Sequence, residues 1–440
     1  MPRILERVGL GRPELRAWAL YDWANSAWVL TIQTAVFPVY FLEVAASELS
    51  EAAALQRYTW TTSIALAVIA LTAPILGALA DFLAVRKRML GTFLAVGVVA
   101  TACMVLIDRG EWILAAVLFG AANIGAQGAF VFYDSLLPHI ARKDEVDRVS
   151  TAGYALGYLG SAILLALQIA WIVSPGSFGL PSGTLPSRLA FLSVAVWWAL
   201  FSIPLFRGVP EPPRRLERDE TRSERPVRVA IDRLRQTFRN IRGYRQAFLL
   251  LIAFLVYNDG IGTIIRMAQI YGAALGLDRN ALIGAIFVAQ LVGIPCTILF
   301  ASLAGRIGPK RAILLGLAVY VGVTIYGYFL DSAREFYAMA IVVGMVQGGC
   351  QALSRSLFAS LVPRHMTGEF FGFYGVLDKF AAVTGPALFG VGVALTGSVR
   401  SGVLTVLVYF LLGAFLLTRV DVDAGRRAAR EAERDLVALA

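Results

Sequence analysis

The sequence predicts an all-α integral membrane protein with twelve transmembrane helices arranged as two six-helix pseudo-repeats. The first observation behind this prediction is composition, since 58% of the 440 residues are hydrophobic, 16% are charged and the mean hydropathy is +0.68. A water-soluble protein has no means of covering that much apolar surface. The second observation is a series of apolar stretches long enough to span a bilayer, and the third is an internal repeat.

Each apolar stretch is interpreted as a helix because crossing a hydrocarbon core about 30 Å thick takes roughly 20 helical residues. The first stretch follows the basic segment MPRILERVGLGRPELR but is longer than the core of a cleavable signal peptide, so we expect it to remain in the protein. The expected spans are Ala17–Leu42, Tyr58–Ala80, Met89–Ile107, Trp112–Leu137, Val149–Val173, Leu189–Phe206, Gln246–Gly272, Leu282–Ala304, Arg311–Leu330, Phe336–Val362, Phe371–Thr396 and Ser401–Arg419.

Basic residues predict the orientation of these helices. The groups Arg86–Arg88, Arg142–Lys143 and Lys310–Arg311 all fall in loops on the side that holds both termini. Because Lys and Arg near helix ends are retained in the cytoplasm, we expect a protein of the cytoplasmic membrane with both termini in the cytoplasm. The net charge of +10 then reflects topology, and no nucleic-acid partner is expected.

A charged, proline-containing segment between the sixth and seventh spans divides the chain. We expect an N-terminal six-helix bundle at 1–206, a basic cytoplasmic linker at 207–245, a C-terminal six-helix bundle at 246–420 and a cytoplasmic tail at 421–440. The second part of the linker predicts an amphipathic helix on anionic lipid, and the alternative is a solvated charged linker. Its apolar stripe consists of Val227, Ile231, Leu234, Phe238 and Ile241.

The two halves repeat one another. Residues 77–87, GALADFLAVRK, resemble residues 301–311, ASLAGRIGPKR, and Ser135-Leu136 with Pro138 matches Ser360-Leu361 with Pro363. A duplicated six-helix unit accounts for both matches. Transporters built from such repeats bind their substrate at the repeat interface and alternate access by rocking one half against the other.

Together with the twelve spans, the loop after the second span resembles the signature of the Major Facilitator Superfamily, Gly-x-x-x-Asp-Arg/Lys-x-Gly-Arg-Arg/Lys. In the second half Gly305 replaces the acidic residue. The resemblance implies that the loop aspartate binds the start of the eleventh helix and gates the transporter, and the alternative is a plain basic turn. The gating candidates are Gly77, Asp81, Arg86, Arg306 and Lys310.

Four longer segments narrow the resemblance. They are YDWANSAW at 21–28, FLVYNDGIGTI at 254–264, GMVQGGCQALSRSL at 344–357 and FFGFYGVLDKF at 370–380. These segments resemble the vacuole effluxer family of that superfamily, which includes a fungal exporter of amino acids. The resemblance implies an amino-acid-like substrate.

Ionisable residues within the spans are functional candidates, because an Asp, Lys or Arg at the centre of a membrane helix costs about 2.5 to 3.5 kcal/mol. Several lie on spans one, four, seven and ten, the helices that line the central cavity in the resembled fold. Each candidate has a structural alternative, either a buried ion pair or an interhelical hydrogen bond. The substrate or proton candidates are Asp22, Asn25, Asp134, Asn258, Asp259, Gln347, Gln351, Arg355, Asp378 and Lys379.

Two cations suggest specific chemistry. Arg355 has a planar guanidinium suited to bidentate capture of a carboxylate. Lys379 is expected to bind a substrate carboxylate, to release a proton when the cavity opens, or to pair with Asp22 or Asp259.

We therefore expect a secondary transporter of a small polar, amino-acid-like solute, with protons as a candidate coupling ion. The alternatives are a non-transporting membrane receptor or scaffold and a multidrug exporter, for which an apolar cavity with few charges would be expected. No nucleophile triad, metal cluster or phosphate-binding loop is visible, so we expect neither an enzyme nor a cofactor or metal site. A monomer is the default for the resembled fold.

Overall fold

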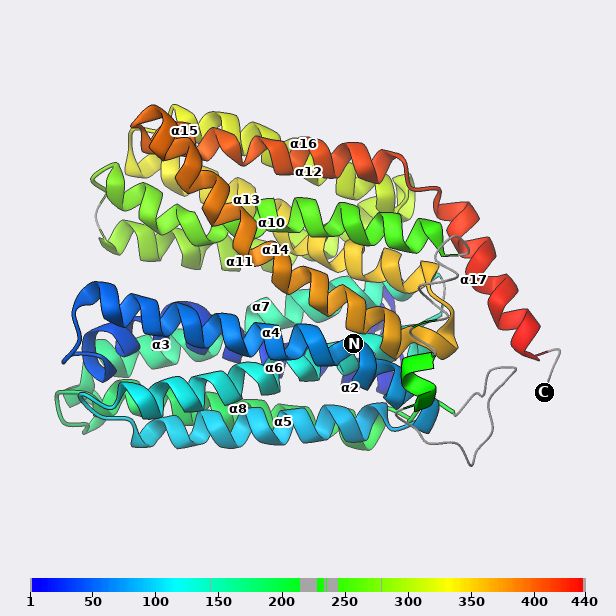
Figure 1. Cartoon of the computed structure of the whole chain (residues 1–440), viewed down its shortest axis with the longest axis horizontal. Coiled ribbons are helices and arrows are strands. Elements are labelled where there is room, and N and C mark those ends of the chain that lie inside the picture. Colours follow the sequence, from blue (N-terminus) through cyan, green and yellow to red (C-terminus); the bar gives the residue numbers. More distant parts are fainter. Residues whose placement is uncertain are drawn as a thin grey trace.

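The computed structural model describes residues 2–142, 144–213, 228–232, 235, 244–277 and 279–437. In this part of the chain the regular elements are helices, which form two bundles lying side by side (Figure 1). The short helix α1 (Pro2–Arg7) precedes the first bundle. The N-terminal bundle contains α2 (Pro13–Trp28), α3 (Phe37–Tyr40), α4 (Glu51–Leu83), α5 (Arg86–Cys103), α6 (Trp112–Ile140), α7 (Val146–Val173) and α8 (Leu185–Gly208).

The C-terminal bundle repeats this arrangement, and a last helix follows it. Its members are α10 (Arg245–Ala274), α11 (Arg279–Ile307), α12 (Pro309–Tyr328), α13 (Ala333–Leu361), α14 (Thr367–Thr396), α15 (Val399–Thr405) and α16 (Leu407–Thr418), and α17 (Val422–Val437) comes last.

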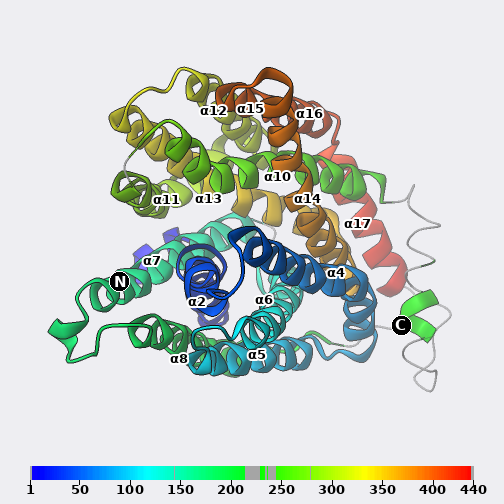
Figure 2. The ribbon, with the colours of Figure 1, turned by 60° about the vertical axis from the view of Figure 1, so that its left-hand side comes forward.

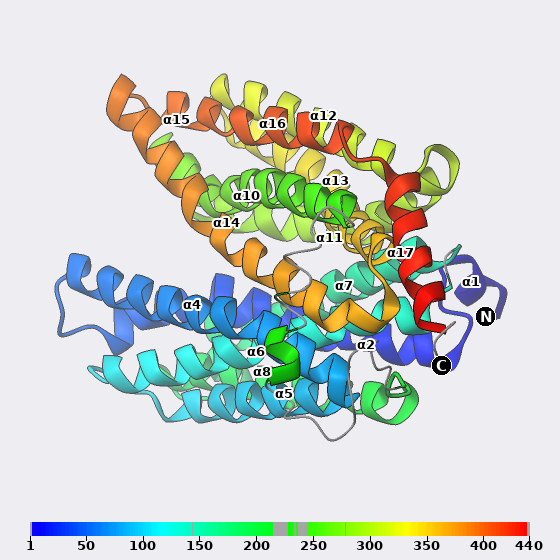
Figure 3. The same ribbon diagram turned by 45° about the vertical axis from the view of Figure 1, so that its right-hand side comes forward.

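The number of spans agrees with the sequence prediction. Within the described residues, eleven helical segments are long and apolar enough to cross a membrane. The 30-residue helix α14 is not among these eleven, but at 1.5 Å per residue it is about 45 Å long and runs the length of the bundles (Figures 1 and 3). The prediction of an integral membrane protein with the twelve-helix fold is confirmed.

The first span is less regular than expected. The sequence predicts one continuous helix, whereas the structure has π-helical turns at Val29–Ala35 and Phe41–Ala45 on either side of α3. Val36 N–H donates to Thr31 O, five residues back, at 2.9 Å. Pro38, in the first turn of α3, has no N–H to continue an α-helical ladder, which accounts for the change of hydrogen-bond register.

Both termini lie at the same end of the bundles, which we call the termini side; the opposite end is the distal side (Figure 3). The two bundles meet along two helix pairs, α4 with α14 and α7 with α11 (Figure 2). α13 also packs on α7. Residues on these helices are therefore placed to hold the two halves together.

Lysines show the repeat in three dimensions. Lys87, in the first turn of α5, donates from Nζ to Phe206 O at 3.0 Å, at the end of α8. Lys310, in the first turn of α12, donates from Nζ to Thr418 O at 2.9 Å and Val420 O at 2.7 Å, at the end of α16. A cation at a helix C-terminus satisfies free carbonyls and opposes the helix dipole. Each half thus ties its last span to its third.

Most of the predicted linker lies outside the described residues, as do Val227, Leu234, Phe238 and Ile241 of the predicted apolar stripe. The described part, 228–232, is helical and buries Val229 and Ala230, whereas Ile231 is 37% exposed. The predicted tail forms α17, which docks on the ends of α10 and α13.

Candidate functional site

A buried cluster around Arg355 joins the two halves near the termini side. Arg355, on α13, donates from Nη2 to Asp22 Oδ2 and from Nη1 to Asp134 Oδ1, both at 3.1 Å. It also donates from Nε to Ser150 Oγ at 2.9 Å and from Nη2 to Ser150 O at 3.0 Å. Arg355 therefore links the C-terminal half to α2, α6 and α7 of the N-terminal half.

Aromatic rings enclose the Arg355 guanidinium. Its central carbon lies 4.8 Å from the ring centroid of Trp18, 5.7 Å from that of Tyr133 and 4.5 Å from that of Tyr154. Such contacts stabilise a cation and exclude water from it. Gly153 provides the space, because a Cβ there would lie 2.3 Å from Asp22 Oδ2.

Asp22 and Asp134 both bind the same cation in this cluster. Two carboxylates, Asp22 and Asp134, share the single guanidinium of Arg355, and Asp22 and Arg355 are 4% and 2% exposed. Buried charges are tolerated only when paired, so removing Arg355 would leave two carboxylates with the same sign at one site. The sequence identified Asp22, Asp134 and Arg355 as separate candidates, with a buried ion pair as the structural alternative. The structure brings the three residues together in such an interhelical ion-pair cluster.

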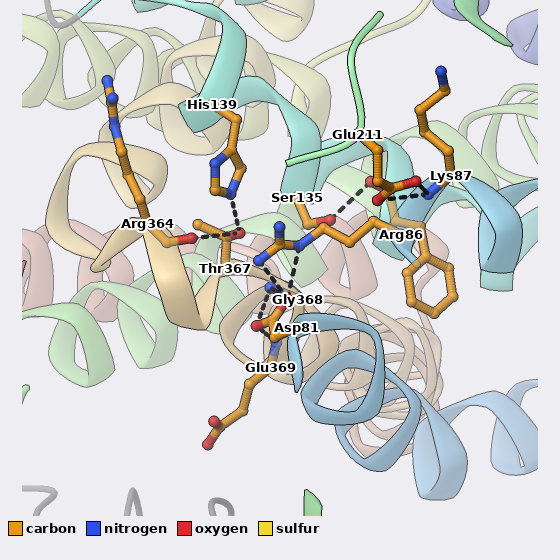
Figure 4. Close-up of polar contacts among 11 residues, drawn as sticks. Asp81, Arg86, Lys87, Ser135, His139, Glu211, Arg364, Thr367, Gly368 and Glu369 are labelled. Carbon is orange, nitrogen blue, oxygen red and sulfur yellow. Dashed lines mark hydrogen bonds and ion pairs between the residues drawn. The ribbon is translucent and has the colours of Figure 1, made fainter. Parts of the chain in front are cut away.

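The predicted gating residue Asp81 forms a second link between the halves at the start of α14. Asp81 accepts hydrogen bonds from Gly368 N–H at 3.0 Å (Oδ1) and 2.8 Å (Oδ2) and from Glu369 N–H at 3.2 Å, and Arg86 donates to Asp81 from Nε at 2.7 Å (Figure 4). A carboxylate at a helix N-terminus satisfies free N–H groups and the positive end of the dipole. His139 reaches the same turn, with Nε2 3.0 Å from Thr367 Oγ1.

Glycines allow this approach of α4 to α14. A Cβ on Gly77 would lie 2.1 Å from Gly368 O, and one on Gly368 would lie 2.4 Å from Asp81 Oδ1. Both distances are far shorter than a real contact, so only glycine fits. Gly77 therefore belongs to the contact that the family signature implies.

The loop after α8 also reaches this region. Glu211 accepts a hydrogen bond from Lys87 N–H at 3.0 Å, at the start of α5 (Figure 4). Partial burial raises the pKa of Glu211 above its ordinary value, although the hydrogen bonds and positive charges of Lys87 and Arg86 oppose this. The linker thus begins by fastening to the turn that carries Arg86.

Among the described residues, the equivalent loop of the second half shows no such contact through a carboxylate. Arg306 is exposed, and a Cβ on Gly305 would meet nothing within 4 Å. Lys310 binds the end of α16, within its own half. Of the gating candidates, Gly77, Asp81 and Arg86 lie at the contact between the halves, and Arg306 and Lys310 do not.

The sequence analysis did not identify a third link, formed by Asp147 on α7. Ser356 Oγ, on α13, donates to Asp147 Oδ1 at 2.5 Å. One helical turn along α7, Ser150 Oγ donates to Ala352 O at 2.8 Å. Asp147 lies close to the end of its span, where a charged residue is unremarkable in sequence, and only its partner on the other half distinguishes it.

A pocket lies on the distal side of the Arg355 cluster, between α10, α11 and α13. It encloses about 650 Å³, including space open to solvent. Its α13 residues run from Phe336 to Gln347, and Gln347 is eight residues before Arg355, or about 12 Å along the helix. Among the described residues, the lining is apolar except for the side chains of Tyr158, Gln290 and Gln347.

This pocket changes one inference from the sequence. The charges in the spans argue against an apolar cavity, yet Asp22, Asp134 and Arg355 pair with one another and do not line the pocket. Of the predicted substrate residues, Gln347 lines it. Gln351 lies one turn closer to Arg355 on the same helix and is partly buried.

The remaining predicted residues lie elsewhere. Asn25 is fully buried on α2, and its side-chain amide has no hydrogen-bond partner among the described residues. Asp259 is buried on α10 beside α14, where a Cβ on Gly385 would lie 2.8 Å from Asp259 Oδ1. Asn258 is its neighbour on α10. The side chains of Asp378 and Lys379 lie outside the described residues.

Comparisons with known proteins agree with this fold. The family model described as "Vacuole effluxer Atg22 like" matches residues 50–430. A Bacillus subtilis relative, named as an uncharacterized MFS-type transporter, YxiO, is 38% identical over 418 residues, covering 94% of this chain and 96% of the relative. Autophagy-related protein 22-2 of Aspergillus niger is 25% identical over 464 residues, covering 86% of this chain and 77% of the relative.

Solved structures show the same architecture. The human organic anion transporter MFSD10 superposes with a TM-score of 0.66 at 15% identity, covering 94% of this chain and 99% of that one. The proton:xylose symporter XylE superposes with a TM-score of 0.67 at 14% identity, covering 94% of both chains. The chain therefore belongs to the Atg22-like vacuole effluxer family and is a transporter of the Major Facilitator Superfamily.

Proposed function

We propose that this protein is a secondary transporter that works by alternating access, and that the structure is its state closed on the termini side, which faces the cytoplasm. The observation that carries this proposal is the buried cluster in which Asp22, Asp134 and Ser150 of one half hold Arg355 of the other. The pocket lies beyond that cluster, toward the distal side. Separation of the halves at Arg355 would give the pocket a route to the termini side.

The same cluster supplies a mechanism for proton coupling. When the halves separate, Arg355 leaves with α13, whereas Asp22 and Asp134 remain in the N-terminal half. Two carboxylates that shared one guanidinium then lose that positive charge, and like charges at close range favour protonation of one of them. Opening of the termini side therefore takes up a proton. Closing releases this proton, because Arg355 returns and stabilises the charged form of the carboxylates.

The pocket supports a solute with an apolar body and a small polar part. Ile264, Ile286 and Val343 offer an apolar surface, and the amides of Gln290 and Gln347 offer hydrogen bonds without a net charge. Ligand sites of this kind bind through apolar contact and are oriented by a few polar groups. Among amino-acid-like solutes, we propose those with apolar side chains, such as leucine and isoleucine.

The apolar lining also favours a second candidate, an exporter of hydrophobic compounds. That candidate predicts binding of bulky apolar cations with no preference for amino acids. The two candidates differ in their response to the α-amino and carboxylate groups of the solute.

Uptake into vesicles containing the purified protein tests these proposals. We expect leucine uptake, with glutamate excluded, to rise several-fold under a pH gradient. Asp134→Asn should remove the response to the gradient, and Asp144→Asn, which changes an exposed carboxylate in the α6–α7 loop, should leave it intact. Leucine uptake that ignores the gradient would rule out proton coupling. Binding of hydrophobic dyes without amino-acid uptake would favour the second candidate.

A further inference from the structure

Tyr158 brings the N-terminal half into contact with the pocket. Among the described residues that line the pocket, Tyr158 lies on α7 and the others lie on α10, α11 and α13. α7 packs against both α11 and α13 (Figure 2). A solute in the pocket that touches Tyr158 would therefore contact both halves of the molecule.

Two glycines of the C-terminal half make room for the Tyr158 ring. A Cβ on Gly348 would lie 2.5 Å from Tyr158 Cε2, and a Cβ on Gly293 would lie 3.2 Å from Tyr158 Cδ2. The first distance is far too short for a real contact, and the second is tight. The ring thus fits into a notch between α11 and α13 that a side chain at either glycine would narrow.

The backbone that carries Tyr158 is packed tightly against its own half. A Cβ on Gly157 would lie 2.4 Å from Ser26 Oγ. A Cβ on Gly160 would lie 2.7 Å from Trp23 Cδ2. These distances show that α7 lies directly on α2 on both sides of Tyr158. When the halves separate, Tyr158 therefore moves with the N-terminal half and its ring leaves the notch.

The Tyr158 hydroxyl is buried beside the pocket and makes no hydrogen bond with the described residues. It lies near the Gln347 side chain, but its Oη atom has no hydrogen-bond partner among the described residues. The same is true of Oγ1 of Thr297, a fully buried residue that also borders the notch at Gly348. A buried hydroxyl is costly to leave unpaired, so a polar group of a bound solute would gain by pairing with it.

The polar groups of the pocket gather at its inner end, which is the end nearest the Arg355 cluster. On both α11 and α13, the described lining residue closest to the termini side is a glutamine, Gln290 and Gln347 respectively. Toward the distal side the lining is apolar and includes Ile286 and Phe336. A solute with a polar head and an apolar body would therefore place its head at the inner end.

We propose that the Tyr158 hydroxyl, supplied by the N-terminal half, donates a hydrogen bond to the carboxylate of the solute at this inner end, where Gln290 and Gln347 supply their amides. This inference rests on the proposed function, because it assumes an amino-acid-like solute in this pocket. A phenol suits the role, since O–H donors form their stronger hydrogen bonds with charged acceptors. Tyr158 is thus a specificity-determining residue that separation of the halves withdraws from the solute.

Calorimetric titration of the full-length protein in detergent with L-leucine tests this role. Tyr158→Phe keeps the ring and removes only the hydroxyl, so thermal unfolding without solute should match that of the parent protein. The affinity for leucine should fall about tenfold, because one hydrogen bond to a charged group is lost. The affinity for 3-methylbutylamine, which is leucine without its carboxylate, should be the same in both proteins.

The matched control is Tyr320→Phe. Tyr320 on α12 is fully buried, and its hydroxyl also has no hydrogen-bond partner among the described residues. It is not one of the residues that line the pocket. Tyr320→Phe should therefore bind leucine as the parent protein does.

The outcomes separate the role of Tyr158 from the proposed function. Leucine binding by Tyr158→Phe with the affinity of the parent would refute the role and leave the proposed transport standing. Equal losses in Tyr158→Phe and Tyr320→Phe, or equal losses for leucine and the amine in Tyr158→Phe, would also refute a bond to the carboxylate. If the parent protein binds no leucine, the proposed substrate class fails, and the role of Tyr158 fails with it.

Discussion

Arg355 shows at the scale of one residue how a membrane protein can retain buried charge. The guanidinium uses its Nε, Nη1 and Nη2 atoms as donors to Asp22, Asp134 and Ser150, and aromatic rings cover its faces. Desolvation of such a cluster is costly and is offset only while every member is present. The same property makes the cluster suitable as a gate, because its partners belong to different halves.

We predict that Arg355→Ala destabilises the protein by about 3 to 5 kcal/mol, because it removes the guanidinium that the carboxylates of Asp22 and Asp134 share. The midpoint of thermal unfolding in detergent should fall, and transport in vesicles should be lost. The double change Asp22→Asn with Asp134→Asn in the Arg355→Ala background should recover part of the stability and none of the transport. An unfolding midpoint equal to that of the parent would contradict the buried network.

At the scale of elements, the pairing of α4 with α14 depends on an absence of side chains. Gly77 and Gly368 bring the two helix backbones together at the point where Asp81 reaches the start of α14. A helix N-terminus offers free N–H groups only to a partner that comes this close. Gly77, Gly368 and Asp81 are therefore needed together for the contact between α4 and α14.

We predict that Gly77→Ala prevents the close approach and costs about 1 to 3 kcal/mol through overpacking. Transport should fall markedly, because the closed termini side is weakened. Gly322→Ala on α12 is the matched control: a Cβ there meets nothing within 4 Å, and alanine is the better helix former. Equal effects of the two changes on thermal unfolding and transport would show that α4 and α14 do not need this contact.

At the scale of the whole molecule, polar contacts between described residues hold the halves together on the termini side. They include the Asp81 contact with α14, the Arg355 cluster and the Asp147–Ser356 bond. All are polar, and all join residues from different halves. A membrane transporter needs such links to be reversible, and charge-assisted hydrogen bonds combine specificity with modest net strength.

We predict that Asp81→Asn shifts the population toward the open termini side, because charge-assisted hydrogen bonds worth about 1.5 to 3 kcal/mol are weakened. Spin labels at Arg88→Cys and Arg311→Cys, exposed positions at the starts of α5 and α12, should report longer distances. Asp144→Asn should leave the distances unchanged. An unaltered distribution in Asp81→Asn would mean that the contact does not govern closure. The labels require a background without Cys103, Cys296 and Cys350.

Twelve spans, the repeat and the list of unusual polar residues follow from the sequence, because hydrophobic length and the cost of buried charge are local properties. The signature around Asp81 also indicated its partner at the start of the eleventh helix. In contrast, the π-helical turns of the first span depend on how Pro38 resolves its missing hydrogen bond, and the apolar stretch alone reads as one continuous helix.

The sequence by itself determined that Asp22, Asp134 and Arg355 needed a reason to be in the membrane, and that the chain is a twelve-span protein of this family. Only the tertiary structure decided that these three residues form one ion-pair cluster, that the described lining of the pocket beside them is mainly apolar, and that Asp147 and Ser356 join the two halves. The physical reason is that the energetic cost of a charged residue within a membrane span can be recognised from the amino-acid sequence alone. Its partner is chosen by packing, between residues more than 200 positions apart.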